Sequence, residues 1–485
     1  MTLKVHNTLT GGREEFEPLE EGYVRMYVCG PTVYDDPHIG HAKSYVSFDT
    51  VVRYLRYLGY KVKYVQNITD VGHLTDNADE GEDKIEKRAA SERVDPMELV
   101  ETYTKSYFDD MDALNCLRPD ISPRASGHIP EQIEIVKTLL EKGFAYEANG
   151  SVYFDVSKFP EYGKLSGKKI EDLTAGARIE VNPDKKNPAD FALWKKATGG
   201  HILRWNSPWG WGFPGWHLEC SVMATRYLGE TIDIHGGGLE NAFPHHECEI
   251  AQSEAASGKP FVKYWLHNNM VTVNGTKMGK SLGNFITLKD AFGKHHPLAI
   301  RYFVLTSHYR SPLDFSEEAI EAAARGLRRI HNAAGAVRRA LEGSPADAPE
   351  GDDERVREID GFRERFEEAM DEDFNTPQAI AVLSEVVRWT NSYLDEPPQS
   401  PAVLSRLNDT FNVLGGDVLG IVTDTLIGEE PEGGLESRLV ELLIRMRAEA
   451  RGRKDFETAD GIRERLREIG VELMDTPEGT TWKRA

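Results

Sequence analysis

Apolar and polar positions near the start of the chain follow a strand, helix and strand order. Residues 22–30 (GYVRMYVCG) form a short β-rich run that ends on glycine, and residues 61–68 (KVKYVQNI) form a second one. Between them, apolar residues recur at helical spacing over residues 41–59. This order predicts a βαβ unit, whose parallel strands present ligand sites at their carboxyl ends.

The same order returns later in the chain. Residues 217–229 predict a helix, residues 231–234 a strand with the following Gly-Gly-Gly as its turn, and residues 244–258 a second helix. Residues 118–210 mix a helix with β-rich pieces and turn clusters, so we interpret them as an insertion that splits an α/β domain. After about residue 315 the pattern is almost entirely helical, with breaks rich in proline, glycine and acidic residues.

Charge restricts the possible partners. The 485 residues include 58 Lys and Arg against 80 Asp and Glu, a net charge of −22. Such a surface argues against nonspecific binding to membranes or nucleic acid, so a polyanionic partner would need a locally basic patch. Residues 442–485 are close to neutral and supply basic charge against this trend. The alternative is a solvated helix face.

The four cysteines are too scattered for a disulfide framework. The first residues lack an apolar signal core, and no run approaches 18 uncharged apolar residues. We therefore expect a cytoplasmic, multidomain enzyme in a reducing compartment, without a membrane partner.

Two short motifs carry residue types that suit phosphate chemistry. The first strand ends in CGPTVYDDPHIGH, where a turn enters a helix whose free N–H groups favour anions. His38 and His41 flank Gly40, which lets a nucleotide approach the backbone closely. In KMGKS, Lys277 and Lys280 lie in a glycine-flanked loop that can reach a polyphosphate. Taken alone, such histidines are more often structural and such a loop is more often solvent-exposed.

Cysteine, histidine and glutamate residues form a candidate metal site. His245 and Glu249 are four residues apart on a predicted helix, and so share one face. Cys29 ends the first strand, and Cys220 lies on the first helix of the second half. Ligands this widely spaced suit a site positioned by the fold, unlike the close pairs of zinc fingers. Because buried free cysteines are common, spacing alone leaves metal binding open.

Motifs that resemble one family follow one another along essentially the whole chain. They are YVCGPTVYDDPHIGHAKSYVSFD, PGWHLECS, DIHGGGLENAFPHHECEIAQS, KMGKSLGNF, RYFVLTSHYRSPLDFS and KDFETADGIRERLREIGVELMDTPEGTTWKR. Together they resemble the cysteinyl-tRNA synthetases, a family of class I aminoacyl-tRNA synthetases. One departure is Gly279, where the family signature has serine. Both lysines remain, so we expect altered loop flexibility rather than lost chemistry.

The resemblance implies an α/β fold with a Rossmann-type parallel-sheet catalytic domain. A connective insertion would split this domain, and an α-helical bundle and a small anticodon-binding domain would follow it. The implied parts are Rossmann halves at 1–117 and 211–260, the connective insertion at 118–210, a stem-contact region with the KMGKS loop at 261–315, the bundle at 316–427 and the anticodon-binding domain at 435–485.

The resemblance also implies that one Zn²⁺ per subunit selects the substrate thiol. A steric pocket separates cysteine from serine by only about 1–3 kcal/mol, whereas Zn²⁺ binds thiolate strongly and hydroxyl weakly. The implied ligands are Cys29, Cys220, His245 and Glu249. The implied substrate-binding residues are Gly30, Trp216 and His235. Cys248 and His246 match no ligand position, and we expect Cys116 in the core.

The implied reaction joins L-cysteine to ATP, with Mg²⁺, and then transfers cysteine to the 3′ end of cysteine tRNA. The implied catalytic residues are His38, His41, Lys277 and Lys280. The implied ATP contacts are His38, Gly40, His41 and Lys280. The implied anticodon contacts are Arg451, Asp460 and Asp475. Phe456 would either stack on a base or pack its domain, and no obligate protein partner is expected.

Two other functions are compatible with parts of the sequence. A related ligase family joins cysteine to the amine of a sugar–inositol with the same zinc and signature loops, but its members lack the C-terminal region. A noncatalytic tRNA-binding or metal-regulated paralogue would not need intact histidines, lysines and ligands. Cysteine-dependent ATP–pyrophosphate exchange and tRNA charging separate the three functions.

Overall fold

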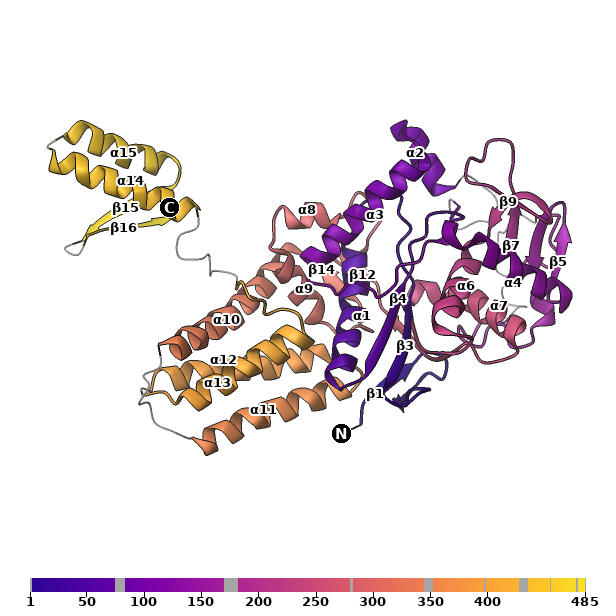
Figure 1. Cartoon of the computed structure of the whole chain (residues 1–485), viewed down its shortest axis with the longest axis horizontal. Helices are drawn as coiled ribbons and strands as arrows, with labels where there is room; N and C mark the ends of the chain where they lie inside the picture. The colour runs from indigo at the N-terminus through magenta and orange to yellow at the C-terminus, as the bar shows by residue number, and fades with distance from the viewer. Residues whose placement is uncertain are drawn as a thin grey trace. The chain divides into compact units, whose positions relative to one another are not determined.

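The computed structural model describes most of the chain in two compact units. The described residues are 2–74, 83–169, 182–279, 282–343, 352–396, 398–426, 435–453, 455–476 and 479–484. The first unit comprises Met1–Thr423 and the second Asp424–Ala485. Each unit is described by itself below, with element labels as in Figure 1.

A four-stranded parallel sheet forms the centre of the first unit. Its order is β11-β10-β3-β4, with β3 at Tyr23–Val28, β4 at Lys61–Gln66, β10 at Ile232–Gly238 and β11 at Val262–Asn268. Strand β3, from the start of the chain, pairs in parallel with β10. The sheet is therefore assembled from the two sequence halves, which confirms the predicted parallel α/β fold.

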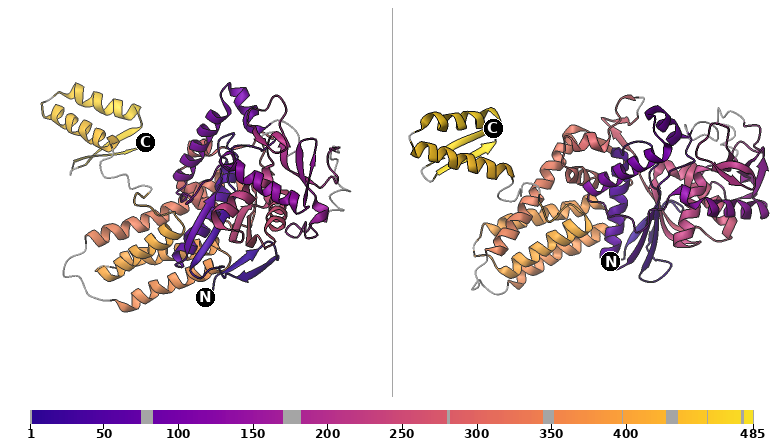
Figure 2. Two further views of the ribbon diagram at one scale, coloured as in Figure 1. Left: turned by 45° about the vertical axis from the view of Figure 1, so that its right-hand side comes forward. Right: turned by 45° about the horizontal axis from the view of Figure 1, so that its top comes forward.

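Helices cover both sides of this sheet. Helix α1 (Ile39–Tyr57) connects β3 to β4, and lies on the opposite side of the sheet from α6 (Trp216–Leu228) and α7 (Glu247–Ser257) in Figures 1 and 2. Helix α1 begins after His38, whose Nδ1 accepts a hydrogen bond from the Gly40 N–H at 3.0 Å. This cap places the histidine motif directly beyond the carboxyl end of β3.

The prediction of a Gly-Gly-Gly turn after residue 234 is wrong. These glycines continue strand β10 to Gly238, which pairs with Asn268 of β11. A Cβ at Gly236 would lie 2.5 Å from the Phe48 ring, and one at Gly237 would lie 2.7 Å from the His246 ring. The glycines therefore serve close packing rather than chain reversal.

The predicted helix at 244–258 has an irregular start. Residues Ala242–His246 form a wider helical turn with a non-helical residue, Phe243, inside it. Regular helix α7 begins only at Glu247. His245 therefore precedes α7 rather than lying within it.

The region between the two halves contains its own sheet. After α2 (Lys84–Glu92) and α3 (Pro96–Ala113), helix α4 (Ile129–Glu141) leads into five antiparallel strands of order β5-β6-β7-β9-β8. These strands are Ala145–Ala148, Ser151–Phe154, Phe191–Lys196, Gly210–Pro214 and Trp205–Ser207 in that order. This sheet lies inside the sequence of the split domain, as the insertion hypothesis requires.

Short elements precede the central sheet and follow it. The hairpin β1 (Lys4–Asn7) and β2 (Gly12–Glu15) comes first, and β12 (Val271–Val273), β13 (Thr276–Lys277) and β14 (Leu313–Phe315) form a small mixed sheet. Helices then dominate: α8 (Leu288–Phe292), α9 (Pro297–Leu305), α10 (Glu317–Glu342), α11 (Asp353–Asp371), α12 (Thr376–Leu394) and α13 (Pro401–Thr410). Figures 1 and 2 show α10 to α13 side by side, as a bundle.

A buried ion pair joins the bundle region to the sheet domain. Arg301 of α9 is fully buried and pairs with Asp49 of α1. It also donates to the carbonyl oxygens of Leu114, at 3.1 Å, and Leu419, at 2.7 Å. One guanidinium thus holds together four segments that are far apart in the sequence.

The second unit is a small α+β module. Helices α14 (Leu435–Gly452) and α15 (Phe456–Glu468) precede a hairpin of β15 (Val471–Thr476) and β16 (Gly479–Arg484). Its core contains Val440, Leu466, Val471 and Leu473.

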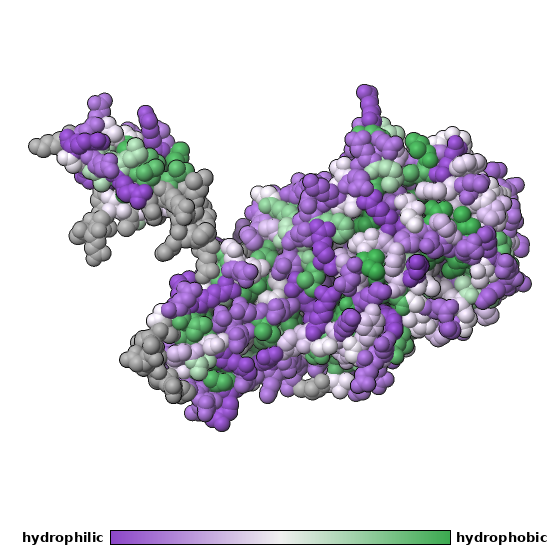
Figure 3. Space-filling view, viewed as in Figure 1, coloured by the Kyte–Doolittle hydropathy of each residue, from purple (hydrophilic) through white to green (hydrophobic). Residues whose placement is uncertain are grey.

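The surface is mainly hydrophilic on the face that Figure 3 shows. Hydrophilic side chains cover most of the face shown in Figure 3, and apolar ones are scattered between them. Among the described residues, no helix combines the length and the apolar character that crossing a membrane requires.

Candidate metal and active site

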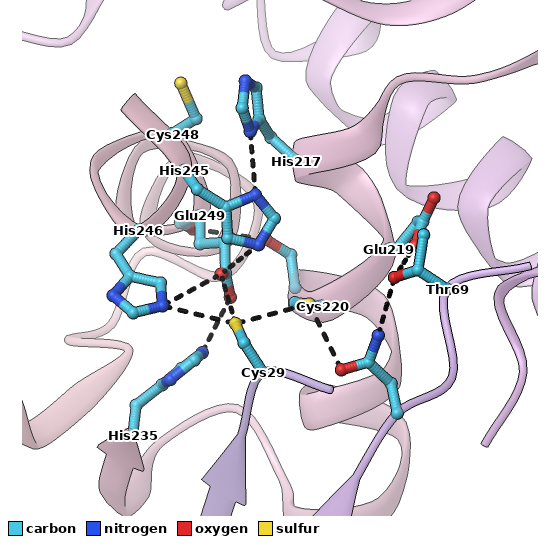
Figure 4. Close-up of polar contacts among 12 residues, drawn as sticks. Cys29, Thr69, His217, Glu219, Cys220, His235, His245, His246, Cys248 and Glu249 are labelled. Atoms are coloured by element: carbon cyan, nitrogen blue, oxygen red, sulfur yellow. Dashed lines mark hydrogen bonds and ion pairs between the residues drawn. The ribbon is translucent and has the colours of Figure 1, made fainter. Parts of the chain in front are cut away.

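Four predicted ligands converge at the carboxyl edge of the parallel sheet. Cys29 follows β3, Cys220 lies on α6, His245 precedes α7, and Glu249 lies in its first turn (Figure 4). We refer to these four residues as the cage. Their candidate ligand atoms all lie within 4.8 Å of one another, and all four side chains are buried. The structure thus brings together the residues that sequence spacing left uncertain.

The distances within the cage fit a tetrahedral metal ion. The two sulfurs are 3.7 Å apart, Cys29 Sγ lies 3.7 Å from Glu249 Oε1, and His245 Nε2 lies 3.1 Å from the same oxygen. A tetrahedral Zn²⁺ with bonds of about 2.3 Å to sulfur places two sulfurs about 3.8 Å apart. Two thiolates, one imidazole and one carboxylate also form a donor set that zinc accepts.

The electrostatics of the cage favour the charged forms of Glu249, Cys220 and His245, and His245 binds a metal only after it loses this proton. Burial opposes ionisation of Glu249, but His235 and His245 outweigh it and lower the pKa of Glu249 to about 2. Against the same burial, Glu249 and Cys220 raise the pKa of His245 to about 10. Burial also opposes the Cys220 thiolate, yet contacts with Cys29 and His245 lower its pKa to about 6. Burial and then Cys220 raise the pKa of Cys29.

His245 is oriented from both sides. Its Nε2 faces Glu249, while its Nδ1 lies 2.9 Å from Nδ1 of His217. A partner at the second ring nitrogen fixes the ring of a metal-binding histidine.

Two further histidines contact the cage. His246, which sequence reasoning left without a role, places Nε2 3.3 Å from Cys29 Sγ. His235 places Nε2 2.9 Å from Glu249 Oε2 and stacks on Trp265. Together with Cys29 and Glu249, these histidines form a second possible ligand group that shares two members with the cage.

The other two cysteines lie outside the cage. Cys248 is fully buried, 3.5 Å from the Tyr162 hydroxyl, and its sulfur points away from the cage in Figure 4. Cys116, predicted in the core, is partly buried as a residue, and burial of its thiol raises the pKa of that group to about 12. It lies at the loop after α3 that receives Arg301, where a guanidinium N–H approaches its sulfur at 3.8 Å.

A chain of buried hydrogen bonds lies next to the cage and contacts Gly30 and Cys220. Asn67 Oδ1 accepts from the Gly30 N–H at 2.8 Å and lies 3.7 Å from Cys220 Sγ. Asn67 Nδ2 donates to Thr69 Oγ1 at 3.0 Å, and Thr69 donates to Glu219 at 2.9 Å (Figure 4). Sequence reasoning missed these residues because they match no motif. The available signal was polar residues directly after β4, at the same sheet edge.

A cavity of about 170 Å³ opens beside the cage. Its lining includes Cys29, Gly30, Thr32, His41, Trp216, Cys220 and His245. Trp216 stacks on His73, with ring centres 4.2 Å apart, and packs against His245 at 4.4 Å. Gly30 and Trp216 therefore line one cavity, whereas His235 is absent from its lining and contacts Glu249 of the cage.

The histidine motif adjoins this cavity. The rings of His38 and His41 stack with centres 3.9 Å apart. The His38 N–H donates to Nδ1 of His41 at 3.2 Å, and the Gly40 N–H donates to Nδ1 of His38. Because each Nδ1 accepts, each neutral ring carries its proton on Nε2. Burial and the charge of His38 hold the pKa of His41 well below its usual range.

The KMGKS loop lies close to the histidine motif. Met278 Cε would be 3.6 Å from a Cβ at Gly40. Asn284 braces the loop, since its Oδ1 accepts from the Gly279 N–H at 2.9 Å and its Nδ2 donates to the Lys277 carbonyl at 3.1 Å. Lys277 is exposed. Lys280 lies outside the described residues.

The predicted anticodon contacts all belong to the second unit. Arg451 is exposed in the last turn of α14, and Asp460 is exposed on α15. Asp475 lies on β15, and its side chain is outside the described part. Phe456, at the start of α15, is 59% exposed, which disfavours a purely structural packing role.

Comparison with known families divides the chain into three matched regions. Residues 15–325 match the family described as tRNA synthetases class I (C) catalytic domain. Residues 365–423 match the DALR domain, and residues 437–482 match the cysteinyl-tRNA ligase anticodon binding domain.

Similar proteins share nearly the full length of the chain. The cysteine--tRNA ligase of Chlorobium chlorochromatii is 54% identical over 486 residues, which cover 99% of each chain. That of a Thermus thermophilus strain is 51% identical, over 100% of this chain and 99% of its own.

Solved structures share the fold at low identity. A methionyl-tRNA synthetase from Mycobacterium tuberculosis has a TM-score of 0.58 at 15% identity, over 84% of this chain and 95% of its own. A leucyl-tRNA synthetase from Agrobacterium radiobacter has a TM-score of 0.59 at 13% identity, over 88% of each chain. The family matches, the full-length relatives and the shared fold agree: the chain belongs to the cysteine--tRNA ligases, the cysteinyl-tRNA synthetase family of class I.

Proposed function

We propose that this protein activates L-cysteine with ATP to cysteinyl-adenylate and transfers the cysteine to the 3′ end of cysteine tRNA. The observation that carries the proposal is the buried cage at the wall of the cavity, beside the histidine motif. A thiol-selective site and a phosphate-binding helix start then face the same space. A reaction between an amino acid and ATP requires this arrangement.

In this proposal the cage residues Cys29, Cys220, His245 and Glu249 hold one Zn²⁺. When bound, Zn²⁺ supplies a thiolate-selective Lewis acid, which separates cysteine from serine more strongly than shape alone. Gly30 and Trp216 shape the cavity in which the substrate side chain lies. His235 positions the ligand carboxylate through its contact with Glu249.

The histidine motif is assigned to the phosphates of ATP. Both rings carry Nε2–H groups, because their Nδ1 atoms accept backbone hydrogen bonds. These N–H groups and the start of α1 donate to phosphate oxygens as charge builds in the transition state. Gly40 keeps the backbone open for the nucleotide, since a side chain there would collide with His38.

The loop lysines are assigned to the leaving group. Lys277 and Lys280 neutralise charge on the departing pyrophosphate, with Mg²⁺ accompanying the nucleotide. The position of Met278 beside Gly40 supports a loop that reaches the same phosphates. No covalent enzyme intermediate is needed, so positioning and charge stabilisation supply the rate.

The second unit is assigned to the anticodon. Arg451, Asp460 and Asp475 read bases, and the exposed ring of Phe456 stacks on one. The reaction and its tRNA substrate also support a cytoplasmic location.

The test combines three measurements on one preparation. Wild-type protein is expected to catalyse cysteine-dependent ATP–pyrophosphate exchange, to charge a cysteine tRNA transcript and to contain about one zinc per chain. Cys220→Ser is expected to lose zinc and exchange together while it stays folded. Cys248→Ser is the matched control, because it removes an equally buried thiol outside the cage.

The three measurements test the metal assignment, the acceptor and the reaction separately. Full exchange in zinc-free Cys220→Ser protein would refute the metal assignment. Exchange without tRNA charging would point to another acceptor for the activated cysteine. Absence of exchange in the wild type would refute the proposed reaction.

A further inference from the structure

His73 packs against the wall of the active-site cavity. Its ring stacks on the Trp216 indole, with ring centres 4.2 Å apart and an angle of 7° between the planes. Its Nδ1 lies 2.6 Å from the hydroxyl oxygen of Thr32. Trp216 and Thr32 both line the cavity, and His73 contacts them from outside the lining. One buried ring therefore touches two residues that face the substrate space.

A lysine sets the direction of the hydrogen bonds at His73. Lys84 Nζ lies 2.7 Å from His73 Nε2. Because an ammonium group can only donate, Nε2 accepts and the ring carries its proton on Nδ1. The Nδ1–H group then donates to the Thr32 oxygen, and the Thr32 hydroxyl keeps its own proton for a further acceptor. We refer to Lys84, His73 and Thr32 as the relay.

Backbone contacts hold His73 in this position. The Lys84 N–H donates to the His73 carbonyl oxygen at 3.0 Å. Asp83, which caps the start of α2, accepts from the Gly72 N–H at 3.0 Å. Gly72 has a φ of +81°, and a Cβ there would lie 2.7 Å from the carbonyl oxygen of Pro214. The glycine thus lets the chain pass directly beside the end of β9, which leads into α6 and its first residue, the indole.

The relay is connected to the cage through the same indole. Trp216 packs against the ring of His245, with ring centres 4.4 Å apart, as well as against His73. A shift of the indole would therefore change the cavity next to a predicted metal ligand. A buried ring with partners at both nitrogens and on its face has little freedom to move, and so it can hold its neighbours in place.

We propose that His73 is a positioning residue for substrate cysteine. Its ring fixes the Trp216 indole as a flat wall of the cavity, and its Nδ1–H group makes the Thr32 hydroxyl a hydrogen-bond donor to the bound amino acid. Lys84 acts through His73 by selecting the Nδ1–H form of the ring. The identity of the amino acid rests on the proposed function.

The test separates the ring of His73 from its hydrogen bonds. His73→Phe keeps the stack and removes both hydrogen bonds, whereas His73→Asn keeps an amide donor near the position of Nδ1 and removes the stack. His128→Phe is the matched control. His128 is 8% exposed, as is His73, and it also makes two hydrogen bonds, to the Arg124 carbonyl and the Tyr227 hydroxyl, but it does not line the cavity.

Three properties are measured for every variant. The KM values for cysteine and for ATP come from ATP–pyrophosphate exchange, and the dissociation constant of an unreactive cysteinyl-sulfamoyl adenosine comes from calorimetry. Zinc content and a thermal melt are recorded on the same samples. The unreactive probe reports on the cavity without any turnover.

The two His73 variants are each expected to raise the KM for cysteine about 3–10-fold, since each loses one hydrogen bond to Thr32 or one ring contact. The KM for ATP and the zinc content should stay at the wild-type values. The control should lower the melting temperature without changing the KM for cysteine. Equal increases in both KM values, loss of zinc, or a KM for cysteine within about twofold of wild type in both His73 variants would overturn the proposal.

Lys84→Met tests the relay without removing a fully buried side chain. It should raise the KM for cysteine on its own and have no further effect when combined with His73→Phe, because the lysine acts only through the ring. Effects of the two substitutions that multiply independently would show that Lys84 acts elsewhere, and would overturn the relay.

The unreactive probe also separates this inference from the proposed function. Wild-type protein that binds the probe and shows the same dependence on His73 and Lys84, but does not catalyse exchange, would refute the proposed reaction and support the relay. Wild-type exchange together with unchanged probe binding in both His73 variants would overturn the relay and leave the proposed reaction standing.

Discussion

Gly30→Ala tests the geometry of the cage with the smallest possible side-chain addition. A Cβ at this position would lie 1.5 Å from the carbonyl oxygen of Asn67 and 2.6 Å from its carbonyl carbon. Real Cβ atoms do not approach other heavy atoms within 3.0 Å, so β3 and β4 must separate by about 1.5 Å here. The obstacle is backbone, and no side-chain rotation relieves it.

The displacement falls on the residue next to the Cys29 ligand. It also lengthens the hydrogen bond from the Gly30 N–H to Asn67 Oδ1, which is 2.8 Å in the structure. Overpacking costs about 1–3 kcal/mol and a lost hydrogen bond about 1 kcal/mol more, which a domain of this size survives. A misplacement of about 1 Å at a reaction site costs about 10²-fold in rate. We therefore expect a folded protein whose exchange activity falls at least about 100-fold.

The assay is cysteine-dependent ATP–pyrophosphate exchange, with zinc content and a thermal melt on the same sample. Gly127→Ala is the matched control, because nothing lies within 4 Å of its added Cβ and its backbone is not left-handed. The control should keep wild-type exchange. Gly30→Ala protein with exchange within about threefold of wild type would refute the argument, because the cage would then tolerate a shift of the Cys29 strand.

Three other predictions follow from the same structure. Lys277→Ala should slow exchange about 10²–10³-fold without weakening tRNA binding. An exchange rate within twofold of wild type would show that Lys277 does not stabilise the transition state. Arg301→Met should lower unfolding stability in urea at neutral pH by about 3–5 kcal/mol, since it leaves Asp49 buried without this partner. Arg301 and Arg53 hold the pKa of Asp49 below its usual value against burial. Protonation of Asp49 removes the ion pair, so the stability difference between wild type and Arg301→Met should shrink as pH falls below about 4. A difference that stays constant with pH would contradict the ion-pair account. Removal of residues 435–485 should leave exchange largely intact and abolish efficient charging, and equal charging would deny the second unit an anticodon role.

Periodicity was a good guide to the sheet and its helices. Short β-rich runs predicted β3 and β4, and helical spacing predicted α1, each to within about two residues, because the apolar positions of both strands and of the helix are buried. The same reasoning wrongly predicted a turn at the three glycines of β10. Glycine usually marks a turn, but here it admits the rings of Phe48 and His246 against the strand, and only the tertiary packing shows this.

The sequence indicated the four cage residues but not the residues that contact them. Residue types and predicted positions indicated Cys29, Cys220, His245 and Glu249 as a candidate metal site but left metal binding open, and the resemblance implied all four as ligands. No pattern indicated Asn67, because its importance comes from its contacts with Gly30 and Cys220, which lie far from it in the sequence. His246 was passed over for a related reason, since its contact with Cys29 depends on the irregular turn before α7.

The central pairing of β3 with β10 has a consequence for biosynthesis. Met26 pairs with Ile234, so at 5–20 residues per second the ribosome needs roughly 10–40 s to supply the partner strand. During that interval Cys29 has none of its three cage partners, which all follow residue 219. The complete cage is therefore a late product of synthesis, and until then the Cys29 thiol lacks the residues that bury it in the finished protein.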